Sequence, residues 1–285
     1  MTNDLPLVWI VVLNWEDWAT TFAALDAARH LAYSNRRVLL VDNGSKHVPH
    51  AELDKAYPEV ALLTTKRNLG FAGGVNVGIR HALANKADFV WLLNNDTKPE
   101  PTALTELVQT AIAQDRAGVV GSAIYDIDSP DRLQSWGGGV ARPWLGYCRH
   151  ASGQNDPPEY ITGASMLLRK EALQETGLFD EDFFFYWEDV DLCTRMRARG
   201  WQCVVASGSR VLHQLASTAG KTEYNRLRWL MSGCVRYLRL HHSLPLVPGL
   251  AGLLFQLTSR LCRMQLRATS GILRGWFEGW RRPIH

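Results

Sequence analysis

The chain has 285 residues, 46% hydrophobic and 21% charged, so it can bury a full core as one large domain or as a domain with an appendage. Its five cysteines are odd in number and scattered, which argues against a disulfide framework or a structural zinc site and favours a reducing compartment. The formal net charge of +3 hides an asymmetry, because from Arg226 onward there are ten arginines, no lysine and one acid, Glu278. No basic segment precedes the first apolar run, so we expect no secretory signal.

Apolar, β-branched runs alternate with helical segments through the first half of the chain. Strands are expected at residues 7–14, 37–42, 60–65 and 88–94, and helices at residues 18–31 and 74–84. This order predicts right-handed βαβ units and a mostly parallel sheet. A ligand of such a sheet lies beyond the carboxyl ends of the strands, where Asn14, Asp42 and Asp96 stand.

The second half is less regular. Strands are expected at residues 118–125, 160–170, 201–206 and 210–213, and a hairpin or flexible region at residues 135–140. Residues 188–200 predict a helix, because acids open it and arginines close it, which complements the helix dipole.

Two segments of the first half could contact a nucleotide. Asp42 could accept a hydrogen bond from a base or ribose, although Asp-Asn-Gly-Ser is also a turn sequence. Gly70, Gly73 and Gly74 allow close approach of the backbone, and the helix start after them offers free N–H groups to a phosphate. Their spacing is not that of the GxGxxG dinucleotide fingerprint.

Asp96 follows an apolar strand and is a candidate metal ligand. A carboxylate there could hold Mg2+ or Mn2+ against the diphosphate of a nucleotide-sugar as it departs. The alternative is that Asp96 caps the helix expected after Pro99.

Residues 179–192 combine six acids with six aromatic side chains. Aromatic faces can pack on the apolar faces of sugar rings, and a carboxylate can take the proton of an acceptor hydroxyl. The alternative is a helix N-terminus at which acids stabilise the dipole. We favour the catalytic interpretation, because unpaired acids beside apolar rings are a poor structural arrangement.

Together, the segments VVLNW, VDNGS, NLGFAGGVNVGI, LLNNDT, TGASMLLRK and FFYWEDVDL resemble the inverting glycosyltransferases of family 2, in particular the rhamnosyltransferase-like subgroup. The resemblance spans residues 5–239. It implies the α/β GT-A fold, Rossmann-like, with a mostly parallel central sheet flanked by helices and a C-terminal helical, basic amphipathic extension. It places a catalytic domain at residues 1–240, with a nucleotide-sugar half at about 1–125 and an acceptor half at about 126–240, and a tail at residues 241–285.

The same resemblance implies a reaction. A sugar, L-rhamnose from dTDP-L-rhamnose, is transferred with inversion to a hydroxyl of a lipid-linked glycan acceptor in cell-surface polysaccharide synthesis. Related subgroups use UDP-sugars with hexose, N-acetylhexosamine or galactofuranose, so these donors remain an alternative. The segment YNRLRW at residues 224–229 resembles the QxxRW of processive synthases, with Asn225 in the place of Gln.

Site residues are carried over on matching positions. The general base is Asp189, with Glu188 as the competing candidate. The resemblance further implies metal ligands at Asp96 and His213, acceptor contacts at Tyr186, Trp187, Glu188, Gly163 and Ala164, and donor contacts at Asn14, Asp42, Asn43, Arg67, Gly70, Gly73, Asn76, Asn94 and Asn95. Asn94 replaces the first acid of the family's DxD motif, and a neutral amide there should weaken metal binding.

Two other classes of function stay open. A GT-A domain could hold a nucleotide or glycan without turnover, which Asn94 favours. A nucleotidyltransferase would share the nucleotide crevice but has no clear use for the Trp-Glu-Asp segment.

The basic tail predicts an amphipathic helix. Its apolar stretch at residues 244–257 is too short to span a bilayer and contains two prolines. Beyond it, arginines at 260, 263, 267, 274 and 281 share one helix side, opposite Leu261, Leu266, Ile272, Leu273, Trp276, Phe277 and Trp280.

Such a pattern is typical of a helix lying on an anionic membrane surface, so we expect a cytoplasmic protein, peripheral on the inner face of the cell membrane, with no nucleic-acid partner. The alternative is packing on the catalytic body or on a second subunit of a homodimer. Gly271, Gly275 and Gly279 would then allow a close helix approach.

Overall fold

The apolar runs of the first half form the parallel strands that the sequence predicts. The computed structural model describes residues 5–214 and 222–284. In spatial order the parallel strands are β3 (Val60–Thr64), β2 (Arg36–Asp42), β1 (Val8–Asn14) and β4 (Phe89–Asn94). The helices that connect them are α1 (Trp18–Arg29), α2 (His50–Ala56) and α3 (Gly70–Ala84).

The predicted α/β fold is confirmed, and the second half makes the sheet mixed. Beyond β4 the sheet continues through β11 (Ser165–Arg169), β6 (Ala117–Asp126), β12 (Gln202–His213) and β5 (Thr97–Pro99), with β7 (Leu133–Trp136) paired to β6. β11 runs antiparallel to both of its neighbours, while β12 is parallel to β6.

One long strand, β12, replaces the two short strands expected at residues 201–206 and 210–213. Its register on β6 shifts between Ala206 and Arg210, so the strand bulges without ending. Ser209 in the bulge is fully buried, and its hydroxyl oxygen lies 2.8 Å from that of Ser122. The bulge is thus held by a buried polar contact that hydrophobic patterning does not reveal.

The glycine-rich stretch belongs to a second, three-stranded sheet. β8 (Gly138–Arg142) pairs with β9 (Tyr147–His150) and β10 (Tyr160–Ile161), and the short helix η1 (Pro143–Leu145) joins β8 to β9. A Cβ atom at Gly138 would lie 2.7 Å from the carbonyl carbon of Tyr160, so this pairing requires glycine. The single strand expected at residues 160–170 is therefore two strands, with a turn between them at Gly163 and Ala164.

Helices cover both faces of the large sheet. The remaining helices of the α/β body are α4 (Ala103–Ala113), α5 (Lys170–Thr176) and α6 (Glu188–Ala198). Val75 of α3 and Leu192 of α6 lie in one buried cluster, and Leu25 of α1 and Leu107 of α4 lie in another. The sheet thus separates two apolar cores. A binding site can therefore form only at the ends of the strands, because both faces of the sheet are covered.

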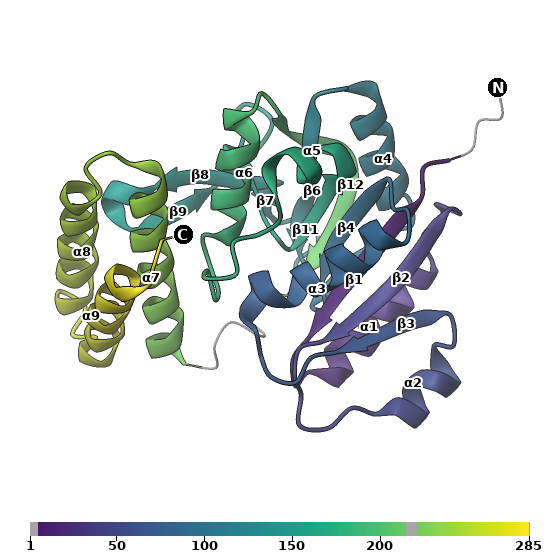
Figure 1. Ribbon diagram of the computed structural model, residues 1–285, viewed down its shortest axis with the longest axis horizontal. Coiled ribbons are helices and arrows are strands. Elements are labelled where there is room, and N and C mark those ends of the chain that lie inside the picture. Colours follow the sequence, from purple (N-terminus) through teal and green to yellow (C-terminus); the bar gives the residue numbers. More distant parts are fainter. Residues whose placement is uncertain (1–4, 215–221, 285) are drawn as a thin grey trace.

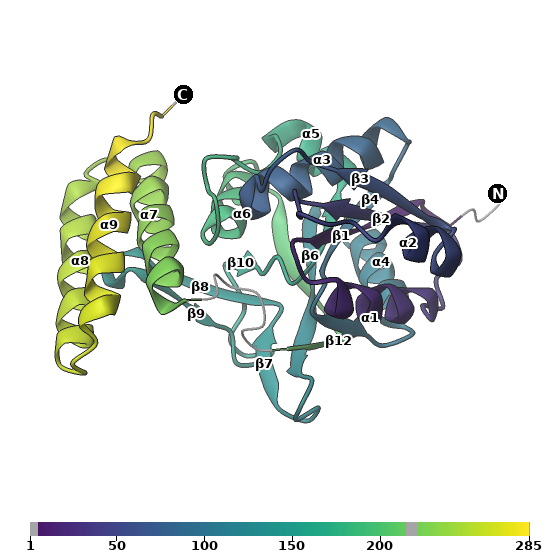
Figure 2. The same ribbon diagram turned by 90° about the horizontal axis from the view of Figure 1, so that it is seen from below.

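The C-terminal part forms a three-helix bundle at the end of the molecule opposite β3, with α7 nearest the body (Figures 1 and 2). Its helices are α7 (Glu223–His241), α8 (Leu246–Leu261) and α9 (Leu266–Arg281). A Cβ atom at Gly271 would lie 2.5 Å from the carbonyl oxygen of Tyr224, and one at Gly279 would lie 2.6 Å from Cβ of Val235. The prediction that the glycine side of α9 admits another helix closely is confirmed, and that helix is α7 of the same chain.

Part of the apolar side of α9 packs inside the protein. Ile272 and Trp276 are 1% and 7% exposed and pack with Leu227 and Met231 of α7. The expectation that these two side chains face a membrane was wrong, because an amphipathic pattern does not say whether a neighbouring helix already covers its apolar side. In the described part of the chain, no helix is both long enough and apolar enough to cross a membrane.

Candidate active site

The edge formed by the ends of β1 and β2 is a closed hydrogen-bond network. Asn14 and Asp42 are 0% and 1% exposed, and Nδ2 of Asn14 donates to Oδ1 of Asp42 at 2.8 Å. The carboxylate also accepts from the Ser45 hydroxyl and from the Ser45 N–H at 3.1 Å. The turn that was one interpretation of Asp42 is therefore present. Contacts of Asn14 and Asp42 with a nucleotide-sugar donor stay a prediction.

The start of α3 is also satisfied within the chain. The helix begins at Gly70, four residues before the expected start, and its first N–H donates to Oδ1 of Asn68 at 2.8 Å. The N–H of Phe71 donates to the carbonyl of Phe184 at 2.8 Å. The sequence suggested that the N–H groups at this helix start are free to bind a phosphate. These two groups are not free, because each already donates within the chain.

Asn43 holds the segment in front of α3. Its Oδ1 accepts from the N–H of Leu69 at 3.0 Å, and its Nδ2 donates to the carbonyl of Gly70 at 2.9 Å. The side chain of Arg67 is exposed at the same edge. Arg67 is thus a cation at this edge that could meet a diphosphate, and its role stays a prediction.

Packing accounts for the glycines of α3 and for Asn76. A Cβ atom at Gly73 would lie 2.8 Å from Cβ of Leu69, and one at Gly74 would lie 2.6 Å from Cδ1 of Leu13. The buried Asn76 amide donates to the Phe179 carbonyl at 2.9 Å and accepts from the Phe179 N–H at 3.1 Å. Asn76 therefore joins α3 to the start of the acidic and aromatic segment at residues 179–192. This use of the amide conflicts with the prediction that Asn76 contacts the nucleotide-sugar donor.

Asp96 and His213 lie together at the carboxyl ends of β4 and β12. Nε2 of His213 lies 3.4 Å from Oδ1 of Asp96, and Asp96 is 8% exposed. Gln134 of β7 fixes the ring, because its Oε1 lies 3.0 Å from Nδ1 of His213 and its Nε2 donates to the His213 carbonyl at 2.9 Å. An amide oxygen can only accept, so Nδ1 of His213 donates to Gln134, and Nε2 is the ring nitrogen that faces Asp96.

This pair fits a divalent cation such as Mn2+ or Mg2+. A carboxylate oxygen and a neutral imidazole nitrogen are suitable ligands, and a second-shell amide sets the ring orientation. Within residues 5–214 and 222–284 no group of three His, Cys, Asp or Glu side chains is arranged to hold a metal ion, so the donor and water would have to complete the coordination. The alternative role of Asp96 as a helix cap was wrong, because Thr102 is the N-cap of α4.

The neighbouring asparagines connect this end to the rest of the site. The backbone N–H of Asn94 donates to the carbonyl of Ala164 at 3.1 Å. Nδ2 of Asn95 donates to the Thr21 hydroxyl at 3.0 Å, which ties the strand end to α1. Gly163 and Ala164 therefore lie directly beside the end of β4.

Asp189, at the start of α6, reaches the same turn. Its Oδ2 accepts a long hydrogen bond, 3.4 Å, from the N–H of Gly163, and its Oδ1 accepts from the N–H of Val190 at 2.8 Å. The preceding Tyr186 and Trp187 have φ of +69° and +73°, an unusual left-handed pair that turns the chain into the helix. Burial raises the pKa of Asp189 to about 6.

Glu188 occupies a different environment. It is 6% exposed, and its Oε2 is buried without a hydrogen-bond partner among the described residues. Burial, and then the nearby charge of Asp189, raise the pKa of Glu188 well above the usual range. Of the two competing candidates, Asp189 is thus the one that ionises at neutral pH, which favours it as the base.

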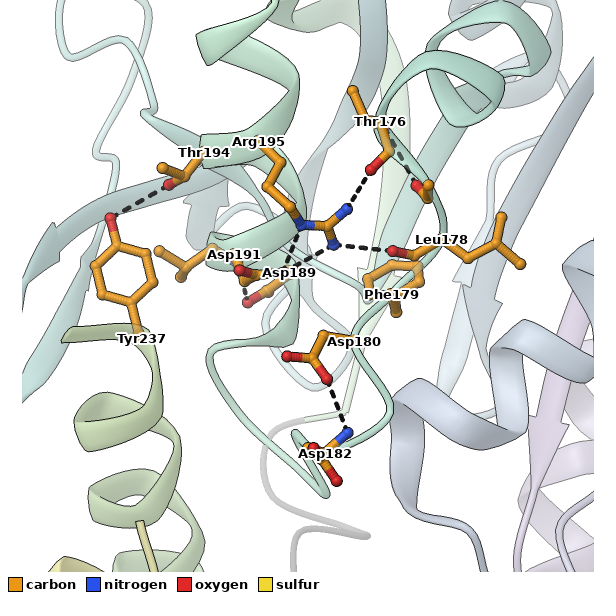
Figure 3. Close-up of polar contacts among 12 residues, drawn as sticks. Thr176, Leu178, Phe179, Asp180, Asp182, Asp189, Asp191, Thr194, Arg195 and Tyr237 are labelled. Carbon is orange, nitrogen blue, oxygen red and sulfur yellow. Dashed lines mark hydrogen bonds and ion pairs between the residues drawn. The ribbon is translucent and has the colours of Figure 1, made fainter. Parts of the chain in front are cut away.

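A buried ionic cluster supports this end of α6. Asp191 accepts from Nε of Arg195 at 2.9 Å and lies 2.7 Å from Nε2 of His241 at the end of α7. Arg195 also donates to the carbonyls of Thr176 and Leu178 at 2.8 and 2.9 Å (Figure 3). The acids of this helix therefore do two jobs, because Asp191 anchors the loop while Asp189 faces the turn.

The aromatic platform differs from the expected one. Trp187 is 1% exposed, its ring centroid lies 5.2 Å from that of Tyr237, and Gly233 of α7 packs on it. It cannot stack on an acceptor sugar, so that assignment was wrong. The half-buried rings are Phe184, Phe185 and Tyr186, with Trp229 of α7 centred 5.0 Å from Phe184. Trp229 was missed, although the YNRLRW segment contained the signal.

A cavity of about 280 Å³ lies beside His213 and the turn at Ala164. Its lining includes His213 on one side, Thr162 and Ala164 on the other, and His150 of β9. Burial lowers the pKa of His150, so this ring is neutral at physiological pH. A larger hollow of about 620 Å³ lies near Trp201 and contains none of the predicted site residues.

Comparison with known proteins identifies relatives of the whole α/β body. The profile of the family described as "Glycosyltransferase like family 2" matches residues 6–232. An N-acetylglucosaminyl-diphospho-decaprenol L-rhamnosyltransferase of Mycobacterium tuberculosis is 31% identical over 253 residues, which cover 80% of this chain and 81% of that protein. The galactofuranosyltransferase GlfT1 of the same organism is 27% identical over 224 residues, which cover 76% and 72% of the two chains.

Solved structures share the fold at low sequence identity. GalNAc-T7, solved with UDP, GalNAc and Mn2+, superposes with a TM-score of 0.69 at 13% identity over 98% of this chain, which spans 57% of that structure. The mannosyltransferase PcManGT of Pyrobaculum calidifontis, in complex with GDP-Man and Mn2+, gives a TM-score of 0.62 at 15% identity and coverages of 98% and 88%.

Proposed function

Because this chain belongs to glycosyltransferase family 2, we propose that it transfers L-rhamnose from dTDP-L-rhamnose, with inversion, to a hydroxyl of a lipid-linked glycan. The rhamnosyl donor and the lipid-linked acceptor are supported by the 31% identical relative, whose name states that activity. The 27% identity to a galactofuranosyltransferase supports a second candidate, a UDP-sugar donor.

The observation that carries the proposal is the turn at Gly163 and Ala164. It joins the end of β4, through the 3.1 Å hydrogen bond from the N–H of Asn94, to Asp189, through the 3.4 Å hydrogen bond from Gly163. One rigid turn thus sets the distance between the strand end that would hold the donor and the carboxylate that would act on the acceptor. A nucleotide-binding domain without turnover has no need of this link.

The reaction is a single displacement. Asp189 takes the proton of the acceptor hydroxyl, and the hydroxyl oxygen attacks C1 of the donor sugar from the face opposite the leaving group. The C1–O bond to the nucleoside diphosphate breaks, so the anomeric configuration inverts. A divalent cation held by Asp96 and His213 would offset the negative charge on the departing diphosphate.

We expect Asp189→Asn to lower the rate of sugar transfer by on the order of 10²–10⁴-fold, because the amide cannot accept the proton. In the unmodified enzyme the rate should fall below about pH 6, where Asp189 becomes protonated. The measurement is release of dTDP or UDP from a panel of nucleotide-sugars with a soluble glycan acceptor, with the anomeric configuration of the product read by NMR.

The matched control is Asp115→Asn, which changes an exposed carboxylate between α4 and β6 and should retain full activity. Full activity of the Asp189 variant would contradict the mechanism. If the protein turns over UDP-galactofuranose and not dTDP-rhamnose, the proposed donor is wrong and the proposed reaction class stands. Binding of nucleotide without turnover of any donor would favour the non-catalytic alternative.

A further inference from the structure

α8 carries an apolar stripe that nothing in the described chain covers. Its inner side packs on η1 and α9 through Gly249 and Gly252. On the opposite side, residues spaced by 3, 4 and 7 positions share one helix face and are 44–62% exposed; they are Val247, Leu250, Leu254 and Leu261.

The exposed apolar surface continues beyond this stripe. Met264, which follows α8, is 88% exposed, and Phe277 of α9 is 56% exposed. Among the described residues, eleven of the fourteen exposed large apolar side chains fall within residues 244–284. Such a concentration marks an interaction surface, since single exposed apolar residues are normally scattered.

α9 and the link that joins it to α8 are strongly basic. Arg263, Arg267, Arg274 and Arg281 are all exposed, and Glu278 is the only acid between residues 242 and 284. That acid is already paired, 2.7 Å from Arg228 and 2.6 Å from Arg274. The surface therefore combines exposed leucines with uncompensated positive charge.

We propose that α8 and the outer side of α9 dock on an anionic phospholipid bilayer, with the leucine stripe at the boundary of headgroups and acyl chains. An in-plane helix with an apolar face and flanking arginines matches the chemistry of such a surface. Figures 1 and 2 place α8 at the outer end of the bundle, away from the α/β body, so the body leaves this side free.

Charge decides between a bilayer and a second copy of the chain. In a two-fold symmetric contact the same patch meets itself, so exposed arginines would face arginines. No free acid is available within the described part of the bundle's two outer helices to compensate them. Anionic lipid supplies the missing negative charge together with an apolar layer.

The experiment uses the full chain, without donor, and vesicles of phosphatidylglycerol and phosphatidylcholine or of phosphatidylcholine alone. The double variant Leu250→Ser, Leu254→Ser should lower the fraction sedimenting with anionic vesicles by at least about tenfold, because two inserted side chains are lost. Ile112→Ser, which changes a 54% exposed residue of α4, is the matched control and should bind as the unmodified chain does.

A second set of variants tests the role of charge. In it Arg263 and Arg267 are both replaced by Ala, and Arg37→Ala in β2 is the control. Binding of the double variant should weaken several-fold, and salt should weaken binding of the unmodified chain, because screening shortens the reach of exposed charges. The proposal is overturned by equal binding of the leucine variant and the control, by equal binding to neutral vesicles, or by a dimer that the leucine variant dissociates. Since no donor is present, failure here leaves the glycosyltransferase proposal untouched.

Discussion

Glu188 and Asp189 are adjacent in the chain, yet the fold gives their carboxyl groups opposite properties. Asp189 is half-buried and accepts two backbone hydrogen bonds, whereas Oε2 of Glu188 has no partner in the described chain. A buried acid without a partner keeps its proton, because the charged form cannot be solvated. The site therefore contains one neutral and one ionisable carboxyl group at neutral pH.

This difference predicts how stability depends on pH. The folded-state pKa of Glu188 is raised, so the folded protein binds this proton more tightly than the unfolded chain, whose Glu titrates near 4.3. Stability should therefore fall as pH rises from about 4.3 toward the folded-state value. Glu188→Gln keeps the shape of the neutral side chain and removes this pH dependence. The Tm of this variant at pH 8 should therefore exceed that of the unmodified protein, by ~2–4 °C for each kcal/mol gained in the free energy of unfolding.

Thermal melts from pH 5 to 8 test this expectation. Exposed Glu171→Gln at the start of α5 is the control and should follow the unmodified protein at each pH. If Glu188→Gln is instead less stable than the unmodified protein at pH 8, the carboxyl group is ionised and bound in the fold.

Gln134 orients His213, one of the two proposed metal ligands. Its two hydrogen bonds to His213 fix the ring so that Nε2 faces Asp96. Gln134→Met retains the length of the side chain and loses both bonds, and should weaken Mn2+ binding about 10–100-fold.

Titration of Mn2+ into the protein with dTDP, followed by electron paramagnetic resonance, measures this affinity. Gln154→Met on the surface is the matched control, and Asp96→Asn should remove most of the binding. An unchanged Mn2+ affinity in Gln134→Met would show that His213 is oriented by other contacts or is not a ligand.

At the scale of elements, α7 connects the bundle to the loop before α6, which carries Asp180 to Trp187. On one side it receives the glycine face of α9, and on the other a Cβ atom at Gly233 would lie 2.5 Å from the carbonyl of Tyr186. Arg236, 4% exposed, pairs with Asp180 and Asp182 at 2.8 and 2.9 Å. Any shift of α7 would therefore move the loop that carries Tyr186 to Asp189.

Gly275 tests this connection. A side chain there would overlap the Arg228 carbonyl, so Gly275→Leu should destabilise the protein by about 1–3 kcal/mol and also lower transfer activity. Ser270→Leu adds the same side chain to an exposed position of α9 and should do neither. Chemical denaturation followed with the transfer assay gives both values, and equal behaviour of the two variants would separate the bundle from the site.

At the scale of the whole molecule, the sequence predicted what depends on local pattern. Apolar runs predicted the strands β1 to β4 within one or two residues, and their ends placed Asn14, Asp42 and Asp96 at one edge of the sheet. The sequence could not predict partners from distant segments. Asn76 binds Phe179, 103 residues on, and Trp187 is covered by α7, so neither side chain is available as expected.

The tail shows the same limit for a surface. Its periodic pattern predicted an amphipathic helix, and α9 is one, with Ile272 and Trp276 on its apolar side. Only the packing of three helices shows that α7 takes up this side and that α8 carries the exposed stripe instead. The tail thus does expose apolar side chains, most of them on α8, and membrane binding by this surface stays a proposal.

The contacts of Arg236 have a consequence for the order of events during translation. Its Nη1 donates to the carbonyl of Pro283 at 2.9 Å, and the side chain of Arg282 donates to the carbonyl of Asp182. The ribosome releases the sheet and the Trp-Glu-Asp segment long before these residues. A nascent chain can thus form its α/β body early, while the loop before Asp189 gains its last contacts only after Pro283 has emerged, so the proposed active site is completed late in synthesis.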